Sequence, residues 1–125
     1  MSKNNPEMTP VEWRIMRVVW QEQPCAAPTV QEALQEETGW TYSTVKTVMD
    51  RMVKKGLLKT ERIRNLILYR AVLSRSHAQK EEIMRTMKRA FNGAFTPMVQ
   101  SLIESDNVTE EELDELEELI RRKRR

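Results

Sequence analysis

The sequence predicts a mainly α-helical protein with a single small β hairpin near its middle. Three observations predict this class. Apolar residues recur at spacings of three and four over most of the 125 residues, as on the buried face of a helix. Only 3 glycines and 5 prolines interrupt this pattern. Between about residues 57 and 72 it gives way to two short strand-like runs that are separated by a turn.

Composition and charge indicate one domain, or one small domain with an appendage, whose partner is a polyanion. Hydrophobic residues make up 39% of the chain and charged residues 32%, and the formal net charge is only +2. This total conceals a concentration of positive charge, because residues 40–75 hold nine basic and two acidic side chains, a net +7. Such a stretch fits an electrostatic footprint for nucleic acid.

Several classes of protein are excluded by what the sequence lacks. One cysteine allows no internal disulfide and no cysteine-rich metal cluster. No apolar run approaches about 18 residues and the N-terminus does not read as a signal peptide, so we expect a cytoplasmic protein that meets no membrane. There is no glycine-rich phosphate loop and no nucleophile elbow, so we expect neither an enzyme nor a cofactor or metal.

The first two helices are marked by their ends. Residues 9–12 (Thr-Pro-Val-Glu) form a capping box with proline at the first helical position, which predicts a helix that ends near Gln21. Residues 23–25 are a break. A second helix is expected to begin at residues 27–30 and to end around Glu37, before a glycine-containing turn.

The third helix is the most informative stretch of the chain. Thr41 can cap its start, and Gly56 can supply the left-handed residue after its end. Its apolar face is formed by Val45, Val48, Met49, Met52 and Val53. The other side carries short hydroxyls and long cations with one carboxylate: Ser43, Thr44, Lys46, Thr47, Asp50, Arg51 and Lys54. Such a face can lie in a DNA major groove; the alternative is an ordinary solvated helix face.

The order of these elements predicts a winged helix-turn-helix over residues 1–75. Two short helices joined by a tight turn, the second polar and basic outside, form a helix-turn-helix pattern. Residues 57–62 and 66–72 then read as strands joined by a turn through residues 63–65, which makes the hairpin a wing. Its Arg62 and Arg64 can reach backbone phosphates; the alternative is a hairpin that only covers the core.

Residues 76–125 predict a helical dimerisation region. Gly93 and Pro97 indicate a kink or break, and residues 109–112 form a second capping box that opens a last helix. The apolar stripes have no third element to pack against, so we expect a second copy of the chain to bury them. They consist of Ile83, Met87, Phe91, Phe95, Met98, Val99, Leu102, Ile103, Leu113, Leu116, Leu119 and Ile120.

An ordered set of residues resembles the BlaI/MecI/CopY family of bacterial transcriptional repressors. The set runs from Thr9-x-x-Glu12-Trp13, with Met16 and Trp20, through Trp40-Thr41-x-x-Thr44-Val45-Lys46-Thr47 and Arg51-Met52-Val53-x-Lys55-Gly56-Leu57-Leu58 to Tyr69. The resemblance implies a dimeric winged-helix repressor of a double-stranded DNA operator, with palindromic half-sites similar to TACA and TGTA. It also implies that five residues lie at the groove, namely Ser43, Thr44, Lys46, Thr47 and Arg51.

Together with the helix geometry, this resemblance gives an assignment of DNA contacts. We expect base or near-base contacts from Thr44, Lys46 and Thr47. We expect phosphate contacts from Arg51, Lys54, Lys55, Arg62 and Arg64. Tyr42, at the edge of the apolar face, either contacts a thymine methyl group or the DNA backbone, or packs within the protein.

Two departures from the family leave the inducing signal open. The β-lactam-responsive branch is cleaved at an Asn-Phe bond in its C-terminal region, where this chain has Ser101-Leu102. The copper-responsive branch carries Cys-x-Cys motifs near its C-terminus, and this chain has no cysteine after Cys25. The resemblance therefore implies transcription control without naming the input, and an upstream sensor or protease is unidentified.

Three other features have a functional and a plainer interpretation. Cys25 is either a redox or metal contact or a structural thiol, and the second is favoured. A metal site at His77, beside Glu81 and Glu82, would need ligands from both protomers and is disfavoured. The tail at residues 121–125 either touches an anion or is a solvated helix end that matches the dipole. The competing function for the whole chain is a protein-interaction module that has lost DNA binding.

Overall fold

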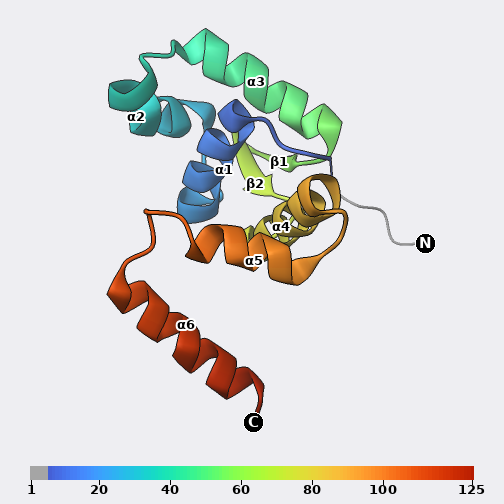
Figure 1. Cartoon of the computed structure of the whole chain (residues 1–125). Helices are drawn as coiled ribbons and strands as arrows, with labels where there is room; N and C mark the ends of the chain where they lie inside the picture. The colour runs from blue at the N-terminus through green and yellow to red at the C-terminus, as the bar shows by residue number, and fades with distance from the viewer. Residues whose placement is uncertain (1–5) are drawn as a thin grey trace, which may run out of the picture. The chain divides into compact units, whose positions relative to one another are not determined.

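The computed structural model describes residues 6–125 and contains the expected helices and hairpin (Figure 1). The elements are α1 (Pro10–Glu22), α2 (Ala27–Thr38), α3 (Tyr42–Lys55), β1 (Leu58–Ile63), β2 (Leu66–Ala71), α4 (Arg75–Phe91), α5 (Phe95–Ile103) and α6 (Glu110–Lys123). The mainly α-helical fold with one hairpin is therefore confirmed.

The chain packs as two compact units, one up to Glu82 and one over Ile83–Arg125. The division falls inside α4 and not between residues 75 and 76, because the first turns of α4 pack on the first unit through Ala78, which is buried. The functional division, with DNA binding over residues 1–75 and dimerisation over residues 76–125, stays a prediction.

Both ends of α1 are formed as the sequence predicts. The Glu12 amide donates to Thr9 Oγ1 at 3.2 Å, and the Thr9 amide donates to Glu12 Oε1 at 2.9 Å, which closes the capping box. Pro10 occupies the first position, where its missing N–H is not needed. The helix ends at Glu22, and Gln23 caps it because its amide donates to the Val19 carbonyl.

A glycine turn joins α2 to α3 and completes the helix-turn-helix. Gly39 has φ 67°, in the left-handed region that a side chain rarely adopts, and it ends α2. Thr41 then caps α3, because its side chain accepts from the Thr44 amide. Gly56, with φ 89°, ends α3 and turns the chain into β1.

The hairpin is antiparallel, and a third short segment extends it. Its register runs from Leu58 opposite Ala71 to Ile63 opposite Leu66. On the other side of β2, Cys25 and Tyr69 exchange backbone hydrogen bonds of 3.2 and 2.8 Å, so the link between α1 and α2 pairs with the wing. The turn is tighter than expected, because Ile63 still belongs to β1.

The core of the first unit lies where α1, α2 and α3 meet the hairpin. In Figure 1, α3 lies along the outside of this unit with α1 and the hairpin on one side of it. The residues that lose all contact with solvent come from every one of these elements or their junctions: Ile15, Met16, Val19, Val30, Val45, Met49, Met52, Leu57 and Tyr69. Burial of these side chains is what orients α3.

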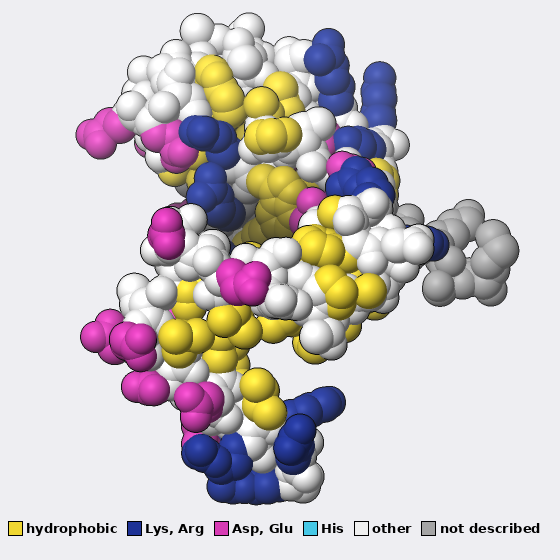
Figure 2. Space-filling view, viewed as in Figure 1, with side chains coloured by type: hydrophobic (Ala, Val, Ile, Leu, Met, Phe, Trp, Pro, Cys, Tyr) yellow, Lys and Arg dark blue, Asp and Glu magenta, His cyan; other side chains and the backbone are white. Residues whose placement is uncertain are grey.

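The second unit consists of helices whose apolar faces are not covered. α4 ends before Gly93, which has φ 82°, so of the expected kink or break the structure has the break, and Pro97 sits in the first turn of α5. Thr109 and Glu112 form the expected capping box of α6. No residue of α5 or α6 is buried. Figure 2 shows acidic side chains along α6 beside hydrophobic ones, and basic side chains at its end.

Candidate nucleic-acid interface

The outward face of α3 carries most of the residues predicted to contact DNA. Val45, Met49 and Met52 are buried on the inner side and fix the rotation of the helix. The opposite side exposes Tyr42, Ser43, Thr44, Thr47, Arg51 and Lys54, whereas Lys46 is half-buried. Figure 2 shows Lys and Arg side chains gathered over the C-terminal half of α3. The face can therefore approach a polyanion without rearrangement of the core.

Lys46 is held in place by a network that reaches the wing. Its ammonium group donates to both carboxylate oxygens of Asp50, at 3.0 and 2.8 Å. The Tyr69 hydroxyl donates to Asp50 Oδ1 at 2.8 Å, and the Lys46 ammonium lies 5.8 Å from the Tyr69 ring centroid. Because Tyr69 belongs to β2 and is fully buried, this network fixes the first turns of α3 against the hairpin.

The network also sets the protonation of its members. The hydrogen bond from Lys46 lowers the pKa of Asp50, and the bond to Asp50 raises the pKa of Lys46 above its usual range. Burial raises the pKa of Tyr69. At neutral pH Lys46 is thus a cation and Asp50 an anion, and a base edge or phosphate that binds Lys46 has to compete with Asp50.

Lys55, which we expected to contact phosphate, faces another part of the protein. Its ammonium lies 2.8 Å from Glu12 Oε1, and this carboxylate belongs to a residue that is only 7% exposed. The pair links the start of α1 to the end of α3. Lys55 therefore has a structural partner, while its neighbour Lys54 points into solvent.

The wing presents two cations at its tip. Arg62 and Arg64 are both exposed, and Arg64 has φ 57°, in the left-handed region. The Arg62 Nε atom donates to the Arg64 carbonyl at 3.4 Å, which directs one guanidinium group along the turn. Further down the hairpin, Arg70 donates to Glu61 at 2.8 Å. The tip arginines can thus reach a phosphate while Arg70 supports the strand pair.

Sequence reasoning missed the roles of three residues. Asp50 lies four residues after Lys46, a spacing that forms ion pairs on helices and could have shown this contact. Glu12 looked like a capping residue alone, and its pairing with Lys55 spans 43 positions of sequence. The donation from Tyr69 to Asp50 also joins separate elements. No local signal predicts the last two contacts.

The residues with two interpretations are placed as follows. Cys25 is buried, and burial, followed by the charge of Glu22, raises the pKa of its thiol, so the thiol is protonated at neutral pH. His77 Nε2 lies 2.9 Å from Glu81 Oε1, one turn along α4. Within residues 6–125, no three His, Cys, Asp or Glu side chains form a group that could hold a metal ion. No helix among these residues has the length and apolarity needed to cross a membrane.

Comparison with known proteins identifies the family. The family model for the penicillinase repressor matches residues 8–122, nearly the whole chain. The chain belongs to the penicillinase repressor family. The methicillin resistance regulatory protein MecI of Staphylococcus aureus is 21% identical over 98% of this chain and 100% of its own length. The penicillinase repressor of Bacillus licheniformis is 25% identical over 94% of this chain and 92% of its own.

Solved structures confirm the fold of the first unit. The monomeric form of BlaI from Bacillus licheniformis, solved in complex with the blaP half-operator, matches with a TM-score of 0.53 at 24% identity, over 61% of this chain and 93% of that one. A MarR family protein from Bacillus stearothermophilus matches 94% of this chain and 74% of its own, with a TM-score of 0.51 at 19% identity. These structures show the winged-helix fold of the first unit, and membership of the penicillinase repressor family makes this chain a transcriptional repressor and not an enzyme.

Proposed function

We propose that this repressor binds double-stranded DNA as a homodimer and recognises a palindromic operator with half-sites of the TACA/TGTA type. One observation carries the proposal. The exposed face of α3 combines threonine hydroxyls and cations on a helix that a buried core and the Lys46–Asp50–Tyr69 network hold rigidly. Hydroxyls and cations on a preorganised helix suit the base edges and phosphates of a major groove.

The contact residues divide by chemistry and position. Ser43, Thr44, Thr47 and Lys46 come from the first half of α3, which is the part of a recognition helix that meets base edges. The exposed cations further along α3 and at the wing tip suit phosphates, namely Arg51, Lys54, Arg62 and Arg64. We assign Lys55 mainly to its ion pair with Glu12, which supports the C-terminal end of α3.

The second unit supports dimerisation through its uncovered apolar side chains. Phe95 is 65% exposed, Leu102 60% and Ile120 56%, and each belongs to an amphipathic helix. Apolar helix faces that are exposed to water favour association with a matching apolar face. A second copy is the partner we propose, because a palindrome of two half-sites about 34 Å apart needs two recognition helices.

The test is fluorescence anisotropy of the full-length protein with two labelled duplexes of equal length. One carries the TACA/TGTA palindrome and the other a scrambled sequence, and both are titrated at two salt concentrations. We expect at least about tenfold preference for the palindrome. The affinity should fall steeply as the salt concentration rises, because Lys and Arg side chains release counterions from the DNA phosphates when they bind. Sedimentation at micromolar concentration should give twice the 14.8 kDa chain mass.

Variants separate sequence recognition from general attraction. Thr47→Ala should lower the preference for the palindrome, whereas Lys54→Ala should weaken both duplexes alike and reduce the salt dependence. Lys80→Ala, which removes an exposed cation of α4, is the matched control. Equal binding of the two duplexes would refute the operator type. Absence of binding to either would support the protein-interaction module instead, and a strict monomer would refute the dimer.

A further inference from the structure

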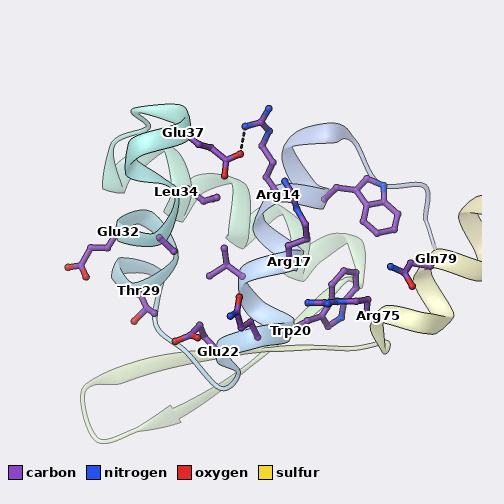
Figure 3. Close-up of a pocket in the computed structure, with 14 residues that line it drawn as sticks. Arg14, Arg17, Trp20, Glu22, Thr29, Glu32, Leu34, Glu37, Arg75 and Gln79 are labelled. Atoms are coloured by element: carbon purple, nitrogen blue, oxygen red, sulfur yellow. Dashed lines mark hydrogen bonds and ion pairs between the residues drawn. The ribbon is translucent and has the colours of Figure 1, made fainter. Parts of the chain in front are cut away.

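A hollow of about 810 Å³ opens on the first unit, and none of the residues that line it belongs to α3 or the hairpin. The fourteen side chains that line it all come from α1, α2 and the first turns of α4 (Figure 3). A volume of this size is typical of small-molecule sites. Four of these residues, Trp13, Arg17, Trp20 and Arg75, define what we call the tryptophan–arginine pocket.

The aromatic wall of this pocket is fixed in place. The ring centroids of Trp13 and Trp20 lie 5.9 Å apart and their planes are inclined by 59°. The indole N–H of Trp20 donates to the Leu73 carbonyl at 2.9 Å, so its ring cannot rotate away without the loss of a hydrogen bond. Two adjacent indoles held in this way offer a preorganised surface for a flat apolar group.

The cations beside the indoles differ in their partners. Arg14 is paired with Glu37 at 2.7 Å, as the dashed line in Figure 3 marks. Arg75 instead lies over Trp20, with its guanidinium carbon 5.7 Å from the ring centroid. Arg17 is exposed, and within the described part of the chain neither Arg17 nor Arg75 has a carboxylate partner. A guanidinium group stacked on an indole keeps its N–H edge free to bind a carboxylate.

The acidic residues of the hollow do not neutralise these two cations. Figure 3 shows Glu32 directed away from the hollow on the α2 side, with Glu22 on that same side, whereas Arg75 lies against Trp20 at the opposite end. The hollow is therefore polarised, because Arg75 and Trp20 lie at one end of it and Glu32 lies at the other. An indole ring beside a guanidinium group favours a ligand that combines a flat apolar group with an anion.

We propose that the tryptophan–arginine pocket binds a small aromatic carboxylate. The ring of such a ligand packs against Trp13 and Trp20, and its carboxylate accepts hydrogen bonds from Arg17 and Arg75. The proposal does not depend on DNA binding, because the pocket residues lie outside α3 and the hairpin. It gives the repressor a site for a small-molecule signal.

The test uses the indole N–H signals of full-length, ¹⁵N-labelled protein during titration with benzoate. The chain has 3 tryptophans, and Trp40 lies outside the pocket as an internal control. We expect the signals of Trp13 and Trp20 to shift saturably, with a dissociation constant in the millimolar range for so small a ligand. Trp13→Phe and Trp40→Phe assign the signals.

Matched probes and variants decide the chemistry. Benzamide, a neutral analogue, and benzylamine, a cation, should bind about tenfold more weakly than benzoate, as should acetate, which lacks the ring. Arg17→Gln and Arg75→Gln should each weaken benzoate about fivefold, while Arg70→Gln in the hairpin leaves it unchanged. Absence of a saturable shift, equal affinity for benzamide, preference for benzylamine, or unchanged binding in both variants would overturn the proposal.

Discussion

The ion pair between Glu12 and Lys55 leads to a testable prediction about stability. The capping box of α6, which resembles that of α1, provides the control. Glu12→Gln keeps the capping box, because an amide oxygen can still accept from the Thr9 amide. The substitution removes only the charge that faces Lys55. In α6, the box formed by Thr109 and Glu112 has the same sequence spacing and lies exposed. Glu112→Gln is therefore the matched control.

The expected magnitude follows from burial. Only 10% of the Glu12 side chain is exposed, and 34% of the Lys55 side chain, so the charges are partly shielded from water. A charged hydrogen bond in such a place contributes about 1–3 kcal/mol, and the neutral amide retains part of it. We expect Glu12→Gln to lower the free energy of unfolding by about 1–2 kcal/mol, and Glu12→Ala by about 2–3 kcal/mol because the hydrogen bond from the Thr9 amide is also lost.

Urea denaturation of the full chain, followed by circular dichroism at one fixed protein concentration, measures these differences. Glu112→Gln should change the free energy of unfolding by about 0.5 kcal/mol or less, as exposed substitutions do. Lys55→Met alone should be costly, since it leaves the Glu12 carboxylate buried without its cation. The double variant should cost less than the sum of the two single ones.

The reasoning would be refuted by either of two results. One is a Glu12→Gln effect no larger than that of Glu112→Gln, which would mean that the charge contributes nothing. The other is strict additivity of Glu12→Gln and Lys55→Met, which would mean that the two side chains act separately. If Lys55→Ala instead left stability unchanged and reduced the salt dependence of DNA binding, Lys55 would be a phosphate contact.

Three further predictions concern the Tyr69 network and the buried thiol. Tyr69→Phe removes one hydroxyl that donates to a carboxylate, so it should lower the free energy of unfolding by about 1 kcal/mol in the same urea assay; no change would contradict the network. Because Lys46 lowers the pKa of Asp50, this carboxylate stabilises the fold above its unfolded pKa of 3.8, and the contribution is lost as pH falls through the lower folded value. Asp50→Asn should therefore flatten the decline of Tm below about pH 5, and an unaltered profile would argue against it. Burial raises the pKa of Cys25, so iodoacetamide should alkylate it at least about tenfold faster in urea than in the native protein; equal rates would refute its burial.

Several parts of the site follow from local rules and could be predicted. Thr9, Thr41 and Thr109 cap helices because a side-chain oxygen within three residues satisfies a free amide, which the sequence alone shows. Gly39 and Gly56 end helices because they adopt positive φ at no steric cost. The helical spacing of apolar residues in α3 predicts which face is buried. The same spacing predicts the exposed face, which carries Thr44 and Thr47.

Other parts depend on contacts between distant segments. The sequence determined the fold class, the helix ends, the face that α3 presents and the resemblance to a repressor family, since these depend on neighbours within a few positions. Only the tertiary structure decided that Lys55 pairs with Glu12, that Tyr69 holds Asp50, and that Arg75 of α4 lies over Trp20 of α1. The physical reason is that such partners are chosen by the packing of whole helices, and no local pattern encodes which side chains that packing brings within hydrogen-bond distance.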